Sequence, residues 1–229
     1  MLGLAMSQAY LIQRKLIREN GVTELWLIRH GETEWSAEGR HTGRMDLPLT
    51  AHGRERAAEL GRFLAGTKFA AVLCSPLLRA RETCEIAGYG GVAVLDEDLR
   101  ERDYGVYEGR TTPEIQKEIP GWSVWKDPLP GGETLEQAGA RADGAIARAL
   151  AVGDVEPTSQ SRDVGHPTED VVRVALFAHA HILRILAARW IGLEPRDGSL
   201  FALGTGSVSV LGWERETRVI LRWNRGFEE

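Results

Sequence analysis

Hydrophobic residues along the chain fall into two kinds of pattern that follow one another. The first kind is a short, nearly continuous apolar run, which is typical of a strand buried on both faces of a sheet. Such runs occupy residues 23–29, 69–75, 92–95 and 171–178. Two further runs, residues 206–213 and 218–223, predict a closing pair of strands, with a hairpin turn across residues 214–217.

The second kind of pattern is helical and follows the strands. Thr50 is a suitable N-cap for a helix in which Ala57, Leu60 and Leu64 recur at spacings of three and four. Thr134 and Gln137 form a capping-box pattern at the start of a later helix. The expected helices occupy residues 49–66, 77–88, 134–150 and 182–192, with a short one near 113–118.

Strands that alternate with helices predict an α/β fold with a mostly parallel sheet. We expect one domain over residues 23–229, preceded by an N-terminal extension of residues 1–22. Residues 96–132 are rich in Gly, Pro and Trp and predict an irregular segment, and residues 152–170 predict a polar loop.

Composition narrows the protein class. The chain has 229 residues, 43% of them hydrophobic and 27% charged, and this is ordinary for a globular protein. Its net charge of −5 argues against a nucleic-acid-binding face. No apolar run approaches the ~20 residues of a membrane helix. The only cysteines, Cys74 and Cys84, are interpreted as small core residues, and we expect a cytoplasmic protein.

Polar side chains follow two of the predicted strands. Arg29 and His30 precede Gly31 at one strand end, while His179 and His181 follow another. In open α/β sheets, ligands bind at the carboxyl edge of the strands, so a shared site is reasonable. The arginine fork suits phosphate oxygens, and a neutral histidine nitrogen can act as a nucleophile. A surface arginine beside a capping histidine remains the alternative.

Other residues carry weaker signals. Arg79 lies in the first turn of a predicted helix. The helix dipole does not favour a cation at this position, but an anion bound there would favour it. Glu101, Asp103 and Glu108 are candidate general acids, and spacing does not choose among them. The i, i+2 histidines also fit a zinc site with His30 and a carboxylate. The histidines expected at the surface are His41, His52 and His166.

The ordered motifs resemble those of the histidine phosphatase, or phosphoglycerate mutase-like, superfamily. They are "LIRHGETEWS", "TGRMDLPLT", "CSPLLRARET", "LRERDYGVYEG", "PGGET" and "FAHAHILR". The resemblance implies a three-layer α/β/α sandwich and a phosphohistidine intermediate on His30. It implies that Glu101 is the proton donor and that the phosphate pocket contains Arg29, Arg79 and His179. It also implies that no metal or other cofactor is used.

Within this family the motifs look most like the sugar-phosphate and acid phosphatase branch. The acidic, short segment around Asp103 differs from the mutase pattern, so a cofactor-dependent phosphoglycerate mutase is the alternative. A phosphate-binding module without catalysis is a third hypothesis. Relatives often have glycine where this chain has Ala180, which would affect a backbone contact to phosphate.

The expected partner is a phosphorylated small molecule, and a homodimer is left open. Arg44 is expected to lie near the same sheet edge and to form a second anion site, while Trp122 and Trp125 could form an apolar wall. The alternative is a solvated Arg44 with both tryptophans in the core. The residues expected to bind substrate, besides the phosphate pocket, are Ser36, Thr42, Gly43, Arg44, Tyr104, Ala180 and His181.

Overall fold

The computed structural model describes residues 23–153 and 171–226. The expected N-terminal extension, residues 1–22, lies outside these residues, and so does His166. The same holds for residues 154–170, which contain nearly all of the expected polar loop. The first strand begins at Thr23, as the apolar pattern predicts.

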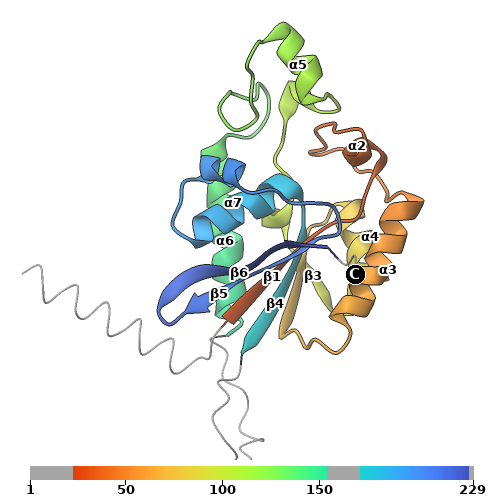
Figure 1. Cartoon of the computed structure of the whole chain (residues 1–229), viewed down its shortest axis with the longest axis vertical. Helices are drawn as coiled ribbons and strands as arrows, with labels where there is room; N and C mark the ends of the chain where they lie inside the picture. The colour runs from red at the N-terminus through yellow and green to blue at the C-terminus, as the bar shows by residue number, and fades with distance from the viewer. Residues whose placement is uncertain (1–22, 154–170, 227–229) are drawn as a thin grey trace, which may run out of the picture.

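A six-stranded sheet forms the centre of the molecule, in the order β3-β2-β4-β1-β5-β6. Strands β3, β2, β4 and β1 run parallel to one another, and β5 and β6 form the antiparallel hairpin that was expected. The prediction of a mostly parallel sheet is therefore confirmed (Figure 1). The strands are β1 (Thr23–Arg29), β2 (Ala71–Cys74), β3 (Ala93–Leu95), β4 (Val172–Ala178), β5 (Val208–Glu214) and β6 (Thr217–Arg225).

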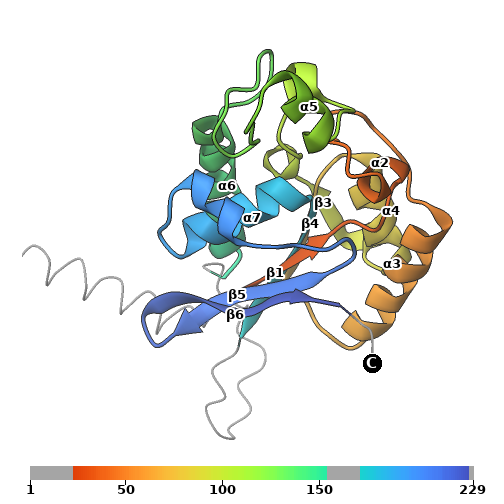
Figure 2. The same cartoon turned by 45° about the horizontal axis from the view of Figure 1, so that its top comes forward.

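Helices cover both faces of this sheet, and the three-layer arrangement is confirmed (Figures 1 and 2). α6 and α7 lie on one face and α3 and α4 on the other. The α-helices are α2 (Glu34–Ala37), α3 (Ala51–Leu64), α4 (Leu78–Ile86), α5 (Thr112–Glu118), α6 (Leu135–Ala151) and α7 (Ala180–Trp190). Short 3-10 helices are η1 (Gly90–Val92), η2 (Glu97–Leu99), η3 (Gly105–Tyr107) and η4 (Pro195–Leu200).

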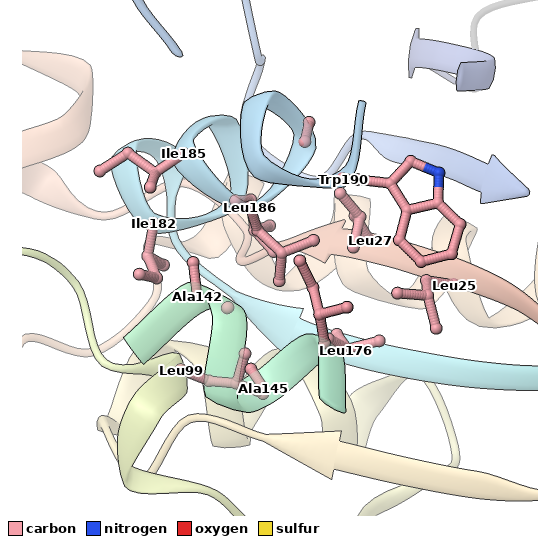
Figure 3. Packing of buried hydrophobic residues seen from close by; sticks show 14 of the residues in the cluster. Leu25, Leu27, Leu99, Ala142, Ala145, Leu176, Ile182, Ile185, Leu186 and Trp190 are labelled. Atoms are coloured by element: carbon pink, nitrogen blue, oxygen red, sulfur yellow. The ribbon is translucent and has the colours of Figure 1, made fainter. Parts of the chain in front are cut away.

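The continuous apolar runs are explained by burial on both faces of the sheet. In β1, Leu25 and Leu27 pack against α6 and α7, as Figure 3 shows, while Trp26 and Ile28 pack on the side of α3 and α4. Successive side chains of a strand point to opposite faces, so a strand covered on both sides needs an apolar residue at nearly every position. Each fully buried Leu or Ile stabilises the fold by roughly 1.5–3 kcal/mol.

Helix caps match the sequence more closely than helix ends do. Thr50 caps α3, and Thr134 with Gln137 forms the capping box of α6. α7 begins at Ala180, two residues before the apolar pattern that predicts it, because the chain turns directly from β4 into the helix. Periodicity does not detect a first turn that holds an alanine and a histidine.

A largely irregular segment, residues 96–134, includes α5. Together with α2 it extends beyond the carboxyl ends of the parallel strands (Figures 1 and 2). It has its own small core of buried residues: Tyr104, Tyr107, Ile115, Trp122, Val124 and Leu129. Within residues 23–153 and 171–226, no helix is both long enough and apolar enough to cross a membrane. The cap formed by this segment closes over the sheet edge where ligands are expected.

Candidate active site

The two strand ends meet, as the sequence predicts. β1 and β4 are parallel neighbours, and Arg29 pairs with Ala178 in their register. The next residue on each strand is a histidine, and the ring centroids of His30 and His179 are 5.1 Å apart. The sheet therefore places both imidazoles at one point of its carboxyl edge.

His30 is held in one tautomer by its own loop. Its Nδ1 lies 2.7 Å from the carbonyl oxygen of Gly31, which only accepts, so Nδ1 carries the proton. Nε2 has no partner among the described residues and carries the lone pair. Burial lowers the pKa of His30 well below its usual range, and the charges of Arg79 and Arg29 lower it further. His30 is thus a neutral imidazole with Nε2 free to react.

Gly31 is needed for space. Gly31 does not adopt a positive φ, so its role is not conformational. A Cβ atom at Gly31 would lie 2.5 Å from the carbonyl oxygen of Gly53, and one at Gly53 would lie 2.2 Å from the carbonyl oxygen of Glu32. The first turn of α3 packs directly on the backbone that follows His30, and this contact fixes the histidine.

Arg29 lines the cavity beside His30 and uses few of its five N–H donors within the described chain. One terminal nitrogen, Nη1, donates to the Leu203 carbonyl, while the buried Nε has no partner. Burial lowers the pKa of Arg29 to about 10, so the guanidinium stays charged at neutral pH. An unpaired buried donor on a cation is costly unless an anion approaches it.

Arg79 and His179 are both fully buried, and neither lines the cavity. Arg79 donates from Nε to Nδ1 of His179 at 3.1 Å and to the carbonyls of Thr42, Gly43 and Met45. These bonds use four of the five N–H hydrogens of the guanidinium. Nε2 of His179 lies 2.7 Å from the Ser75 hydroxyl. His179 therefore fixes the plane of Arg79 beside His30.

Of the three candidate carboxyl groups, only that of Glu101 lines the cavity. Glu108 accepts the main-chain N–H groups of Gly43, Arg44 and Met45, and so holds their loop. Asp103 accepts the N–H of Gly105 and lies 3.4 Å from Nε of Arg44. The fold therefore places Glu101 at the cavity and directs the other two carboxyl groups elsewhere.

The Glu101 carboxylate is buried and rigidly placed. It accepts main-chain N–H groups from Arg102 at 2.9 Å and from His181 and Ile182 at 3.0 Å each. Burial raises the pKa of Glu101, but the imidazoles of His181 and His179 and the His181 N–H lower it by more, to well below its usual range. Glu101 is therefore ionised when the site is free.

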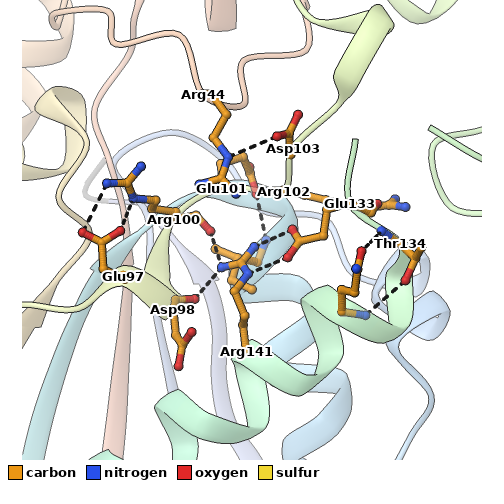
Figure 4. Close-up of polar contacts among 12 residues, drawn as sticks. Arg44, Glu97, Asp98, Arg100, Glu101, Arg102, Asp103, Glu133, Thr134 and Arg141 are labelled. Carbon is orange, nitrogen blue, oxygen red and sulfur yellow. Dashed lines mark hydrogen bonds and ion pairs between the residues drawn. The ribbon is translucent and has the colours of Figure 1, made fainter. Parts of the chain in front are cut away.

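A neighbouring ion pair anchors the segment that carries Glu101. Arg141 of α6 binds the Glu133 carboxylate with two N–H groups, both at 2.6 Å, and donates to the carbonyls of Asp98 and Arg100 (Figure 4). Because both side chains are largely buried, this pair fixes the irregular segment against a regular helix. The result is a carboxylate held to the sheet edge without being part of a strand.

The cavity over His30 has a volume of about 230 Å³. The residues that line it and that the sequence singled out are Arg29, His30, Ser36, Thr42, Glu101, Tyr104, Ala180 and His181. The lining residues that sequence reasoning missed are Gly39, Arg40, His41, Arg184 and Leu203. Four expected site residues do not line it: Gly43, Arg44, Arg79 and His179.

Residues of the loop after β1 contribute unequally. Ser36 lines the cavity while its hydroxyl closes the capping box of α2 with Thr33. Thr42 presents a hydroxyl that also donates to the Arg40 carbonyl at 3.2 Å. Arg44 is exposed and lies beside Asp103, as Figure 4 shows. Arg44 therefore does not occupy the place expected for a second anion site.

The turn after β4 supplies two further lining residues. Ala180 is the first residue of α7 and has no positive φ, so alanine in place of glycine introduces no strain there. Nδ1 of His181 lies 2.7 Å from the buried Tyr104 hydroxyl. Burial raises the pKa of this hydroxyl well above its usual range, with Glu101 adding to the effect.

The expectation that His41 lies at the surface is wrong. His41 is buried, with ring centroids 4.9 Å from Tyr104 and 5.5 Å from Trp122. The cause is a backbone pairing between residues 40–41 and residues 109–111. Burial lowers the pKa of His41 to about 4. Sequence offers no signal for a pairing between two irregular segments. His52, by contrast, is exposed as expected.

Arg184 is the most informative of the missed residues. It lies one turn after Ala180 on α7, and its guanidinium carbon is 4.5 Å from the ring centroid of Trp125. It donates to the carbonyls of Gly198 and Ser199 and has no carboxylate partner among the described residues. A spacing of three residues from His181 on a helix was the signal that could have found it.

Neither tryptophan is among the residues that line the cavity. Trp122 is buried in the core of the cap, whereas Trp125 packs against His181, with ring centroids 4.8 Å apart, and contacts Arg184. Cys74 and Cys84 are free and buried, as expected of core residues. In the described part of the chain, no group of three or more His, Cys, Asp and Glu side chains could hold a metal ion.

Comparison with known proteins agrees with this geometry. An acid phosphatase of Mycobacterium tuberculosis is 39% identical over 196 residues, which cover 85% of this chain and 88% of that protein. Sedoheptulose 1,7-bisphosphatase of Saccharomyces cerevisiae is 37% identical over 191 residues, covering 73% and 67%. A solved structure of an open reading frame product from Mycobacterium tuberculosis superposes with a TM-score of 0.78 at 35% identity, covering 90% and 99%.

The match to a family extends over nearly the whole described chain. Residues 25–226 match the histidine phosphatase superfamily (branch 1), and this span contains both strand ends, the buried carboxylate and the cavity. The chain therefore belongs to the histidine phosphatase superfamily.

Proposed function

We propose that this protein is a phosphatase that hydrolyses small phosphate monoesters through a phosphohistidine on His30. The observation that carries the proposal is that one cavity is lined by His30, whose Nδ1 is engaged by the Gly31 carbonyl, together with Arg29 and Glu101. A nucleophile, a cation with an unpaired donor and a buried carboxyl group are the parts that phosphoryl transfer to a protein side chain requires.

In this mechanism the phosphoryl group binds over His30. The Arg29 guanidinium, which lines the cavity, donates to its oxygens, and the charge of Arg79 behind it also stabilises the transferring group. His179 acts by holding Arg79 in place, because both of its ring nitrogens are already engaged. The lone pair on Nε2 of His30 forms the bond to phosphorus as the bond to the leaving oxygen breaks.

Glu101 provides the proton for the leaving oxygen. Although Glu101 is ionised in the free site, a phosphate dianion next to it raises its pKa, because two like charges in a buried site disfavour ionisation. The carboxylic acid then protonates the departing oxygen. In the second half of the reaction, Glu101 removes a proton from the water that attacks the phosphohistidine.

We further propose that the substrate is a sugar phosphate with a second anionic group, which Arg184 binds. Arg184 lines the cavity, has no carboxylate partner in the described chain, and is held by two carbonyls and the face of Trp125. The cavity of about 230 Å³ is smaller than sites for drug-sized ligands, which start at about 300 Å³. The similar bisphosphatase from yeast supports this substrate class.

The test compares a sugar bisphosphate with its monophosphate. A charge-assisted contact of about 1.5–3 kcal/mol predicts that the wild type prefers the bisphosphate roughly ten- to a hundredfold in kcat/KM. Arg184→Gln removes this preference, mainly through KM, while Arg184→Lys retains part of it. Circular dichroism checks that both variants fold.

Arg44→Gln is the matched control, because Arg44 is an arginine near the cavity that does not line it. The preference should survive in this variant. An absent preference in the wild type, or one that Arg184→Gln leaves unchanged, would contradict the assignment of Arg184. Conversion of 3-phosphoglycerate to 2-phosphoglycerate without release of phosphate would instead mark the protein as a mutase.

A cytoplasmic location is part of the same proposal. Both cysteines are free and buried, which suits a reducing compartment where thiols stay unpaired. Soluble sugar phosphates are available to a protein there.

A further inference from the structure

His181 lies between Tyr104 and Glu101 and contacts both. Its Nδ1 is 2.7 Å from the Tyr104 hydroxyl and 3.7 Å from Oε2 of Glu101. The ring of His181 also packs against Trp125, with centroids 4.8 Å apart. Nδ1 of His181 thus has both a hydroxyl and a carboxylate as neighbours. If Nδ1 carries a proton it can donate to either group, and if it carries none it can only accept from the hydroxyl.

Hydrogen-bond accounting selects that direction. The Tyr104 side chain is 1% exposed, and its hydroxyl has no other partner in the described chain. If the hydroxyl accepted a proton from Nδ1, its own O–H would be buried without an acceptor, which is costly. If it donates to Nδ1, both groups are satisfied. His181 then carries its proton on Nε2, which has no partner among the described residues and belongs to a residue that lines the cavity.

We propose that Tyr104 is a positioning residue that holds His181 as the neutral Nε2–H tautomer and thereby prevents an ion pair between His181 and Glu101. The Tyr104 hydroxyl donates to Nδ1, the ring nitrogen of His181 that lies 3.7 Å from the carboxylate, so Nδ1 carries no proton of its own. Glu101 then remains free to exchange its proton with substrate and water, and His181 presents Nε2–H to the cavity as a neutral donor for a substrate oxygen.

The surroundings of His181 favour the neutral ring. Burial lowers the pKa of His181, against the opposite effect of Glu101. The charges of Arg184 and Arg102 lower it as well, and the neutral His41 ring lies 6.3 Å away. Burial also keeps the proton on Tyr104. Three main-chain N–H donors stabilise the Glu101 carboxylate, so the site needs no charge on His181 to hold it.

Loss of the hydroxyl has a defined consequence. Without the Tyr104 proton, Nδ1 of His181 can bind a proton and turn toward Oε2 of Glu101. An opposite charge at that distance lowers a carboxyl pKa by about 1–3 units. With a lower pKa, Glu101 would lose its proton at a lower pH, and that is the proton which the leaving oxygen needs. This consequence rests on the proposed function, whereas the tautomer of His181 does not.

The direct test is the tautomer itself. Long-range ¹H–¹⁵N correlation spectra of the full chain, with His181 assigned through His181→Gln, should show a protonated Nε2 and an unprotonated Nδ1 from pH 6 to 8. A protonated Nδ1, or a fully protonated ring, in the wild type at neutral pH overturns the proposal. This measurement needs no substrate, and the tautomer is read from the wild type.

Kinetics supply the second test. For Tyr104→Phe with a sugar phosphate, the alkaline limb of the kcat profile should move to lower pH by about one unit or more. With p-nitrophenyl phosphate, whose leaving group needs little protonation, the shift should be much smaller. Tyr107→Phe is the matched control: it removes a phenol hydroxyl three residues away, in the cap core and outside the cavity, and should shift neither profile.

A double variant tests whether Tyr104 acts on Glu101 through His181. In His181→Gln there is no imidazole to protonate, so adding Tyr104→Phe should leave the alkaline limb where it is. A shift of equal size in the His181→Gln background would mean that Tyr104 acts on Glu101 without His181, and the proposal would fail. If no phosphate ester is hydrolysed at all, the proposed function fails, while the spectra still decide the tautomer.

Discussion

The imidazole of His30 is held by a hydrogen bond from Nδ1 to the Gly31 carbonyl and lies beside two guanidinium groups. The carbonyl directs the proton away from the cavity, and burial with the two cations keeps Nε2 unprotonated. At the scale of one residue, this arrangement suits the proposed role of His30 as the nucleophile. A neutral imidazole attacks phosphorus without first having to lose a proton.

The lowered pKa of His30 predicts how activity depends on pH. The reactive form is the base, and it persists until the pH falls below the pKa of His30 in the folded protein, which lies well under 6.5. We expect kcat/KM, corrected for the fraction of substrate present as the phosphate dianion, not to fall between pH 7 and pH 5. A histidine with an ordinary pKa of 6.5 would lose about thirtyfold over this range. A fall of that size in a protein still folded by circular dichroism would contradict the account.

Packing between elements holds the reactive loop in place. Thr50 caps α3 and its N–H donates to the Glu32 carbonyl at 2.9 Å, while Gly53 allows the helix to approach that same carbonyl. The first turn of α3 therefore supports the three residues after β1. This arrangement joins a catalytic side chain to a helix that never contacts the cavity.

The contact predicts the effect of Gly53→Ala. A Cβ atom 2.2 Å from a backbone oxygen forces a shift, so we expect a loss of roughly 1–3 kcal/mol, or about 2–12 °C in Tm, together with loss of activity. Gly144→Ala in α6 is the control, since its Cβ would meet only the ends of the Asp98 and Arg148 side chains. Thermal unfolding and phosphate release should separate the two variants; equal behaviour would refute the packing argument.

Sequence patterns predicted the elements more completely than the contacts between them. Apolar runs found the strands, and Thr50 and Thr134 marked the helix starts, because these signals are local. The burial of His41 was not predictable, since it depends on two irregular segments that pair only in the folded protein. Arg184 was missed because nothing in its own helix shows that the cavity extends over it.

At the scale of the whole molecule, the fold collects groups from distant parts of the sequence at one sheet edge. Arg29 ends β1 and His30 follows it, Glu101 comes from the cap, and His181 and Arg184 come from α7. The parallel strands set the floor of the cavity, and the irregular cap supplies the carboxyl group. Residues of the cap and α7 limit the size of the substrate, while residues at the strand ends bind the phosphoryl group.

The central claim is that the phosphoryl group passes through His30, and trapping it is the most direct test. Rapid quenching during turnover of a ³²P-labelled sugar phosphate should leave protein-bound label that is stable to base and labile to acid, because phosphohistidine has these properties. Peptide mapping should place the label on His30, and His30→Ala should carry none while remaining folded. Label on a serine, cysteine or carboxylate, or full turnover by His30→Ala, would contradict the account.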